Sequence, residues 1–234
     1  MFISVVIPAY NEEKYLPACL RALRRQTFPA EQFEVIVVDN ASTDATATVV
    51  RRWGARLVAE PRKGVSRARQ AGFQAARGPI IASTDADTRV PPDWLARIAA
   101  HFEEEPALGG IYGPVHWPDG RPAARLMLRY PGTWALWASN RARRSLWWGS
   151  NFAVRRDVFR QAGGFPVDWP SGEDTDLSLR VNRIAPVRFD PALVVWASNR
   201  RAQEGARQMF RRGLANVVNR FFLRRAPLTM PDFR

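Results

Sequence analysis

Apolar and polar residues alternate along the first half of the chain in blocks that predict strands and helices in turn. Four short apolar runs, rich in β-branched residues, are typical of strands buried on both faces of a sheet. They span residues 2–7, 33–38, 56–59 and 80–83. Between them, apolar residues three and four positions apart predict helices, the first ending near residue 26 with Asn11 as its N-cap. This order predicts an α/β fold, with a mainly parallel central sheet and helices on both faces.

Polar segments follow three of these strands at their carboxyl ends. They cover residues 8–12, 39–44 and 85–87. In parallel sheets of this kind ligands bind beyond the carboxyl ends of the strands. We therefore expect the three segments to line one crevice.

The third polar segment contains two carboxylates, Asp85 and Asp87, separated by one residue. On an extended backbone alternate side chains point the same way, so the two can converge on one spot. Close carboxylates repel each other unless a cation lies between them, and Mg²⁺ or Mn²⁺ bridging to a diphosphate fits that need. The alternative is an acidic turn, which is the more common explanation for an isolated pair of this kind.

The second half of the chain predicts a helix over residues 91–105, a strand over 111–117, and closing strands at 187–189 and 193–196. His116 is a candidate metal ligand, although a lone histidine is more often structural. Tryptophan and arginine alternate over residues 121–148. Such a segment suits a lipid headgroup zone or the edge of a pocket, or a helix that packs its tryptophans on the domain.

Composition adds a strong basic charge. The net charge is +13 and the isoelectric point about 11.3, with arginine supplying most of the excess. This implies an anionic partner: a phosphate-bearing substrate, a nucleic acid or an anionic membrane surface. Cys19 is the single cysteine, which excludes an internal disulfide and favours a reducing cytoplasm. No apolar run is long enough to predict a membrane span.

The three polar segments, taken with the strands before them, resemble the successive signatures of family 2 glycosyltransferases, which have the GT-A fold. The matching stretches are residues 4–13, 38–44 and 85–87. The resemblance implies that a nucleotide-sugar is held by Pro8, Ala9, Tyr10, Glu12, Asp39, Arg69, Asp85 and Asp87. It also implies that Asp87, with Asp85, ligates a divalent metal (Mn²⁺ or Mg²⁺), which would neutralise a diphosphate leaving group.

Physical chemistry agrees with part of this assignment, because a carboxylate such as Asp39 can accept the imide N–H of uracil. Two departures from the family's usual residues leave the identity of the nucleotide base open. Asn40 stands where the family often has an acidic residue, and Gln70 where it often has asparagine.

A later stretch, residues 149–165 followed by 171–177, resembles the part of the same family that carries its catalytic carboxylates. Asn151 lies in the first piece. Glu173 and Asp174 match the Glu-Asp motif, in which the aspartate is the base. A sugar hydroxyl needs such a group, because it is a poor nucleophile until a carboxylate takes its proton. The alternative is that the two acids only cap and stabilise a helix start.

The resemblance extends over about residues 3–200 and implies an inverting, metal-dependent glycosyltransferase. Because the chain lacks the Gln-x-x-Arg-Trp motif of the family's polymer synthases, we expect a single sugar addition. A nucleotidyltransferase and a basic nucleic-acid-binding protein are the alternatives. A nucleotidyltransferase usually has a glycine-rich loop after its first strand, and residues 8–11 do not form such a loop. In the second, the carboxylate clusters would repel a phosphate backbone.

The chain is expected to divide into a nucleotide-sugar-binding half (1–115), an acceptor-binding and catalytic half of the same domain (116–200), and a basic amphipathic tail (201–234). Apolar residues of the tail form a helical stripe between 209 and 225, suited either to a membrane interface or to packing on the domain. We expect a cytoplasmic protein, peripheral on the inner face of the membrane, with a lipid-linked saccharide or cell-envelope glycan as acceptor. Whether Arg200 or Arg201 reaches phosphate is left open.

Overall fold

The computed structural model describes residues 1–117, 133–141, 145–169 and 171–198. The predicted C-terminal tail, the pair Arg200 and Arg201, and much of the tryptophan–arginine segment lie outside these residues. Within the described part of the chain, no helix combines the length and the hydrophobicity needed to cross a membrane.

The main sheet has seven strands in the order β3-β2-β1-β4-β8-β6-β9. Its parallel half comes from the predicted alternating region: β1 (Ile3–Ala9), β2 (Phe33–Asp39), β3 (Arg56–Ala59) and β4 (Ile80–Ser83). The other strands come from the second half of the chain: β6 (Gly110–Tyr112), β8 (Phe152–Arg155) and β9 (Val187–Phe189). Because β8 alone runs antiparallel to its neighbours, the prediction of a mainly parallel sheet is confirmed.

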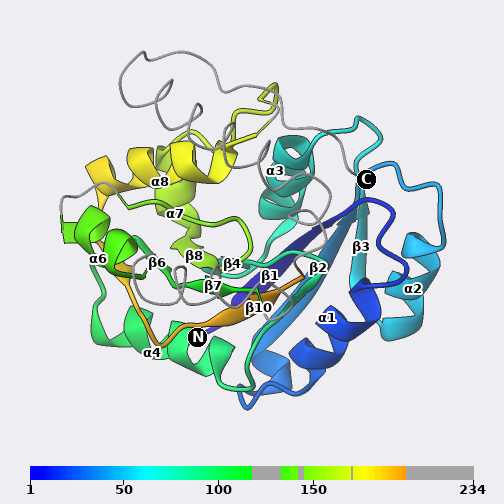
Figure 1. Cartoon of the computed structure of the whole chain (residues 1–234), viewed down its shortest axis with the longest axis horizontal. Coiled ribbons are helices and arrows are strands. Elements are labelled where there is room, and N and C mark those ends of the chain that lie inside the picture. Colours follow the sequence, from blue (N-terminus) through cyan, green and yellow to red (C-terminus); the bar gives the residue numbers. More distant parts are fainter. Residues whose placement is uncertain (118–132, 142–144, 170, 199–234) are drawn as a thin grey trace.

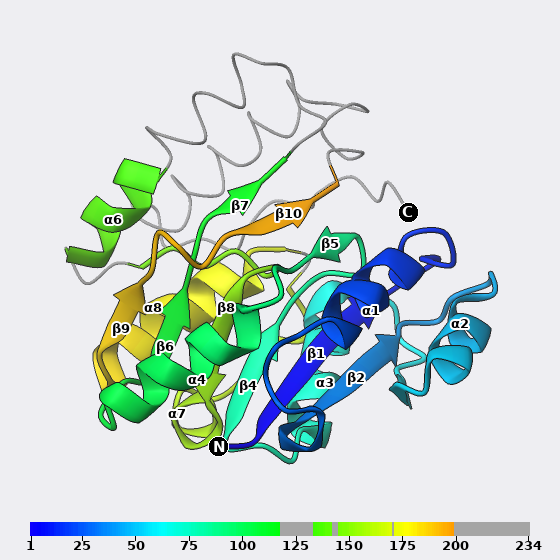
Figure 2. The same cartoon turned by 90° about the horizontal axis from the view of Figure 1, so that it is seen from below.

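Helices cover both faces of this sheet, as predicted (Figures 1 and 2). One face carries α1 (Leu16–Arg24), α2 (Thr46–Trp53) and α4 (Trp94–Glu104), and the other α3 (Val65–Ala75), α7 (Arg156–Gln161) and α8 (Glu173–Ile184). The 3₁₀ turn η1 (Ala30–Gln32) and the helix α6 (Thr133–Arg141) complete the described helices. The sheet therefore separates two cores, and successive residues of β1 enter different ones, Val5 the first and Val6 the second.

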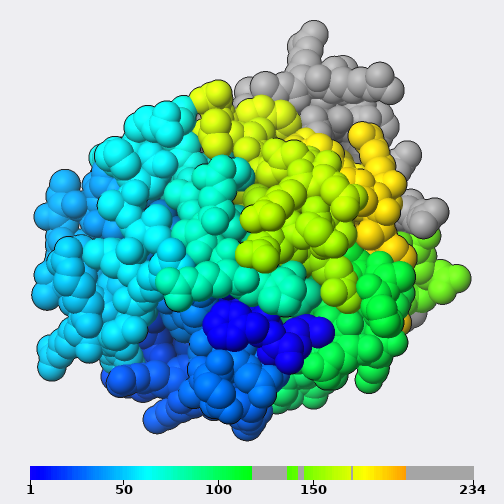
Figure 3. Space-filling model, turned by 180° about the vertical axis from the view of Figure 1, so that it is seen from behind, coloured from blue at the N-terminus to red at the C-terminus, as the bar shows by residue number. Residues whose placement is uncertain are grey.

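The second core joins the two halves of the chain. Figure 3 shows the segments of α3 and α7 side by side on the surface that covers it. Beneath that surface the rings of Phe73 and Phe159 lie 4.8 Å apart, and Phe165 meets Phe73 edge to face at 4.9 Å. The proposed donor and acceptor halves are thus packed as one body.

A small second sheet lies beside the carboxyl ends of the central strands (Figure 2). It consists of β5 (Thr88–Arg89), β10 (Val195–Ala197) and β7 (Val115–His116), in that order. The prediction of one strand over residues 111–117 is wrong, because the chain leaves the main sheet after β6 and enters the small sheet as β7. A Cβ atom on Gly113 would lie 2.0 Å from the Leu193 carbonyl oxygen, so this crossing requires glycine.

The first helix also begins later than its polar signals suggest. Helix α1 starts at Leu16 with Tyr15 in the capping position, so the prediction of Asn11 as N-cap is wrong. Asn11 instead has φ of 54°, and its Oδ1 accepts the backbone N–H of Thr43 at 2.8 Å. Asparagine tolerates this left-handed conformation, which turns the chain out of β1.

Candidate active site

The loops that follow β1 and β2 are joined by hydrogen bonds in both directions. The backbone N–H groups of Asn11, Glu12 and Glu13 donate to side chains of the second loop and of the first residue of α2, at 2.8 to 3.1 Å. In return, the backbone N–H of Ala45 donates to the Glu13 carboxylate at 3.0 Å. Two of the three polar segments expected to share one crevice therefore lie together at one edge of the sheet.

Asp39 and Asn40 have different roles in the second loop. Asp39, at the end of β2, is partly exposed, and its Oδ1 accepts the backbone N–H of Ser42 at 3.1 Å. Asn40 is buried, and its amide donates to the carbonyls of Glu60 and Arg62 while accepting the N–H of Gly64. A carboxylate could not donate those two bonds. The asparagine thus fixes the 60–64 turn, whatever base is bound.

The three residues expected at the end of β1, Pro8, Ala9 and Tyr10, are all buried. Pro8 and Ala9 are buried members of the strand, so what they contribute is the position of the residue that follows. That residue, Tyr10, receives a hydrogen bond of 2.5 Å from Lys63, whose ammonium also lies 4.5 Å from the centre of the tyrosine ring. The sequence offered no signal for Lys63, because its partner lies in another loop.

Asp85 and Asp87 follow β4 in a tight turn. The strand ends at Ser83, and the N–H of Thr88 closes the turn by donating to the Asp85 carbonyl at 3.0 Å. The argument from alternation along an extended strand therefore does not apply here. Both side chains are nevertheless partly exposed at the carboxyl end of the sheet, where the other polar loops meet.

Arg69 links this turn to the Glu-Asp motif. Its guanidinium is buried, donates to Asp85 Oδ1 at 2.8 Å and pairs with the buried carboxylate of Glu173. Burial would lower the pKa of this guanidinium, but nearby carboxylates, Glu173 first, raise it above its ordinary value. Arg69 was expected at the nucleotide. The structure shows it holding two carboxylates from opposite halves of the chain.

Gly149 completes this junction, and sequence reasoning gave it no role. A Cβ atom at this position would lie 2.1 Å from a nitrogen of the Arg69 guanidinium, so only glycine allows the contact. Its backbone N–H donates to Asp174 Oδ2 at 2.6 Å, and its carbonyl accepts the Ser83 hydroxyl at 2.7 Å. A single residue thus connects the end of β4 with the candidate base.

Asp174 lies in the first turn of α8, partly exposed. Its second oxygen, Oδ1, accepts the N–H of Thr175 at 2.7 Å. Burial raises the pKa of Asp174 to about 6, and the charge of Glu173 adds to this effect, while Arg69 opposes it. A carboxylate with a pKa near neutrality is suited to accept and release a proton.

Two neighbouring polar residues are engaged elsewhere. Asp176 is buried and forms two contacts with Arg180, of 2.8 Å to Nε and 2.7 Å to a terminal nitrogen. Asn151, expected at the acceptor, has no exposed surface. Its amide bonds the Trp94 indole and the carbonyls of Pro114 and Leu193. The position of Asn151 supports a structural role, in which it ties β7 and β10 to the main sheet.

The acidic groups at this edge suit a divalent cation. Burial raises the pKa of the Cys19 thiol, and three carboxylates, Asp87, Asp85 and Glu12, raise it further, which shows that negative charge gathers here. Among the described residues no group of three or more metal-binding side chains is arranged to hold an ion by itself. Mg²⁺ is usually held by one or two carboxylates together with substrate phosphates. Asp87 and Asp85 fit that requirement.

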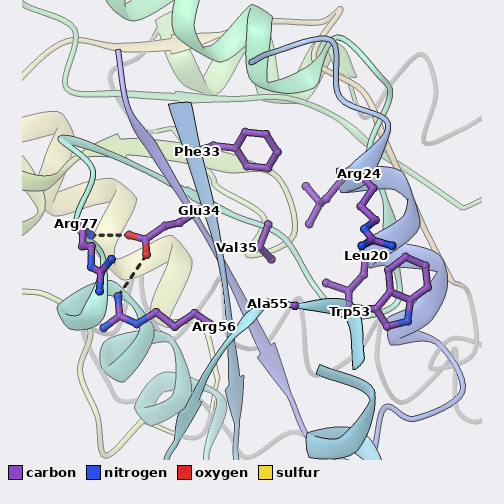
Figure 4. A pocket seen from close by; sticks show the side chains of 11 residues that line it. Leu20, Arg24, Phe33, Glu34, Val35, Trp53, Ala55, Arg56 and Arg77 are labelled. Atoms are coloured by element: carbon purple, nitrogen blue, oxygen red, sulfur yellow. Dashed lines mark hydrogen bonds and ion pairs between the residues drawn. The ribbon is translucent and has the colours of Figure 1, made fainter. Parts of the chain in front are cut away.

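A pocket and the residue His116 lie apart from this site. A pocket of about 410 Å³ lies at the opposite ends of β2 and β3, between Phe33, Trp53, Arg56 and the residues around them (Figure 4). It lies at the amino ends of these strands, away from the carboxylates. His116 lies in β7, in register with Trp196, and the described residues place it in no metal-binding cluster.

Comparison with known proteins agrees with the fold. A model of the family described as "Glycosyl transferase family 2" matches residues 4–163. Glycosyltransferase AglE of Haloferax volcanii is 32% identical over 188 residues, which cover 76% of this chain and 60% of AglE. The chain therefore spans about three fifths of that relative's length.

Two solved structures have folds similar to that of this chain. One is the mannosyltransferase PcManGT of Pyrobaculum calidifontis in complex with GDP-Man and Mn²⁺. The TM-score is 0.76 and the sequence identity 26%, and the match covers 96% of this chain and 65% of the PcManGT chain. The other is S. aureus TarS 1–349 in complex with UDP-GlcNAc, with a TM-score of 0.70 and 22% identity over 85% of this chain and 58% of its own. These overlaps confirm the predicted GT-A fold.

Proposed function

Because the chain belongs to glycosyl transferase family 2, we propose that it moves one sugar from a nucleotide-sugar to an acceptor hydroxyl, with inversion at the anomeric carbon. The observation that carries the proposal is the junction of Asp174, Gly149, Arg69 and Asp85. It joins a carboxylate suited to act as a base to the acidic turn at the end of β4.

Asp174 acts as the general base in this proposal. It takes the proton of the acceptor hydroxyl as the hydroxyl oxygen attacks the anomeric carbon from the face opposite the diphosphate. The new carbon–oxygen bond forms while the bond to the diphosphate breaks, and the proton remains on the carboxylate. The backbone N–H groups of Gly149 and Thr175 orient that carboxylate.

The donor lies along the loops that follow β1, β2 and β4. In this proposal Asp39 accepts an N–H of the base, and Tyr10, held by Lys63, lies near it at the end of β1. Asp87 and Asp85 would hold a divalent cation, which when bound neutralises charge on the departing nucleoside diphosphate. The complex of PcManGT with GDP-Man and Mn²⁺ supports both the donor class and the metal.

The proposed place of action is based on the charge of the chain. With a net charge of +13 and a basic segment over residues 201–234, the protein suits an anionic surface. We propose that it works at the inner face of the membrane on a lipid-linked saccharide or a cell-envelope glycan.

The test is a nucleotide-sugar panel, including UDP-GlcNAc and GDP-Man, assayed for nucleoside diphosphate release with Mn²⁺ or Mg²⁺. EDTA should abolish turnover, excess metal should restore it, and Asp87→Ala should lose the response to metal. Asp174→Asn should lower transfer at least ~10²-fold, the usual scale for a general base, with donor affinity kept. In the wild type, transfer should rise with pH through about 6, as Asp174 loses its proton.

The matched control is Asp168→Asn, since this aspartate lies before the same helix but has a side chain 80% exposed. It should retain transfer. An enzyme that is fully active in EDTA would refute the metal assignment, and transfer that survives Asp174→Asn would refute the base.

A further inference from the structure

Trp148 is exposed in a segment whose other residues are buried. From Trp147 to Val154 all other side chains are buried, whereas the Trp148 side chain is 40% exposed. Trp147 stacks on Phe152 in the second core, with ring centres 4.7 Å apart. A single exposed aromatic residue is not unusual on a protein surface. What sets Trp148 apart is how it is held and what lies next to it.

The indole ring of Trp148 is supported from behind. It meets the ring of Trp117 edge to face, with centres 5.4 Å apart and planes at 67°. Trp117 in turn packs against the first core at the end of β7. The backbone is fixed as well, because the Trp148 carbonyl accepts the N–H of Asn151 at 2.9 Å. The ring is therefore a firm apolar surface that solvent reaches.

The candidate base, Asp174, is bonded to the residue that follows Trp148. The next residue, Gly149, donates its N–H to Asp174 at 2.6 Å and lies against the guanidinium of Arg69. A hydroxyl that loses its proton to Asp174 must come within about 2.6–3.2 Å of that carboxylate. We therefore expect the rest of the acceptor molecule to reach the neighbouring indole.

We propose that Trp148, supported by Trp117, is a stacking platform for a pyranose ring of the acceptor. This rests on the proposed function and names its acceptor class as a saccharide. A pyranose has an apolar C–H face and hydroxyl groups at its rim, and an indole offers a flat apolar face of similar size with a polar N–H at its edge. Stacking orients the ring so that one hydroxyl of its rim meets the base.

The experiment compares three variants: Trp148→Ala, Trp148→Phe and Trp137→Ala. Trp137 is the matched control, because it is 45% exposed on α6 and has the Arg141 guanidinium over its ring. The acceptors are methyl glycosides of common hexoses and their disaccharides. Transfer to these and release of the donor sugar to water are measured with the same nucleotide-sugar.

For Trp148→Ala we expect the KM for the saccharide acceptor to rise about tenfold, the scale of one lost aromatic contact with its buried area, while donor KM and kcat stay within about twofold. Trp148→Phe should give a smaller rise, since a ring remains. Trp137→Ala should behave like the wild type.

The inference is overturned if acceptor KM is unchanged in Trp148→Ala, if Trp137→Ala raises it equally, or if donor KM rises instead. Wild-type protein that neither hydrolyses nor transfers any nucleotide-sugar would overturn the proposed function and this inference together. Intact donor hydrolysis with an unchanged acceptor KM would overturn the platform alone. If the alanine variant fails to fold, the phenylalanine variant decides on the same criteria.

Discussion

Replacing Asp174 by asparagine should remove activity and yet stabilise the fold. In the folded protein the pKa of Asp174 rises from 3.8 to about 6, with burial as the largest cause. Because the folded pKa lies above the unfolded one, the ionised carboxylate destabilises the native state at any pH above about 6. The destabilisation fades as the pH falls from 6 through 3.8, below which both states bind the proton. Asparagine is permanently neutral and avoids this cost, but it has a single acceptor oxygen and keeps only one of the two backbone N–H bonds that Asp174 accepts.

The size of the effect follows from the same numbers. A rise from 3.8 to about 6 corresponds to roughly 3 kcal/mol of unfolding free energy at pH 8. Since the side chain is partly exposed, solvent screening reduces this to roughly 2 kcal/mol, and the backbone N–H that loses its acceptor offsets about 1 kcal/mol, which leaves a gain of roughly 1 kcal/mol. For a chain of this length that gain would raise the melting temperature by about 2–4 °C. At pH 4.5 only about a third of the electrostatic part remains, so the gain should disappear.

The assay is urea unfolding of the wild type and Asp174→Asn at pH 8 and pH 4.5, followed by circular dichroism. Asp176→Asn is the contrasting variant, because it leaves the half-buried Arg180 without its carboxylate and should destabilise by about 2 kcal/mol. The reasoning is refuted if Asp174→Asn is less stable than the wild type at pH 8. An equal gain at both pH values would also contradict it, because the gain must follow ionisation.

Two further predictions concern the buried arginine and the C-terminal segment. Arg69→Met leaves Glu173 buried without its partner and should cost about 3–5 kcal/mol in urea unfolding. Arg67→Met breaks a pair whose acid is exposed and should cost at most about 1 kcal/mol, so equal losses would contradict the importance given to burial. In co-sedimentation, the full chain should bind anionic liposomes better than neutral ones, by about 1 kcal/mol for each arginine at the surface. A chain ending at Arg207 should lose this preference, and binding that survives the truncation would exclude the segment as the anchor.

The central strands of the parallel half could be predicted because they are buried on both faces. Every residue of β1 is buried, so the run is apolar except for Ser4 and is recognisable from sequence alone. The place of β8 between β4 and β6 could not be predicted, because periodicity carries no information about which distant strands pair. The division of residues 111–117 between two sheets depends on the close approach of Leu193 to Gly113, which is equally long-range.

The candidate site, like the fold, could be predicted only in part from the sequence. Asp85, Glu173 and Asp174 could be selected by resemblance, and the structure connects them through Arg69 and Gly149. That connection was invisible in the sequence. A glycine required by a guanidinium from a distant helix looks like any other glycine until the helix is in place.

The position of β8 has a consequence for synthesis of the chain on the ribosome. Strand β4 pairs with β1 on one side and with β8 on the other, so that second side stays open until residues 152–155 have left the exit tunnel. During that interval the nascent chain presents an apolar strand with unpaired backbone groups, a template for pairing with other chains. A fragment of residues 1–115 would keep this edge permanently. Expressed by itself, it should depend on chaperones to stay out of aggregates, even though it carries most of the proposed donor site.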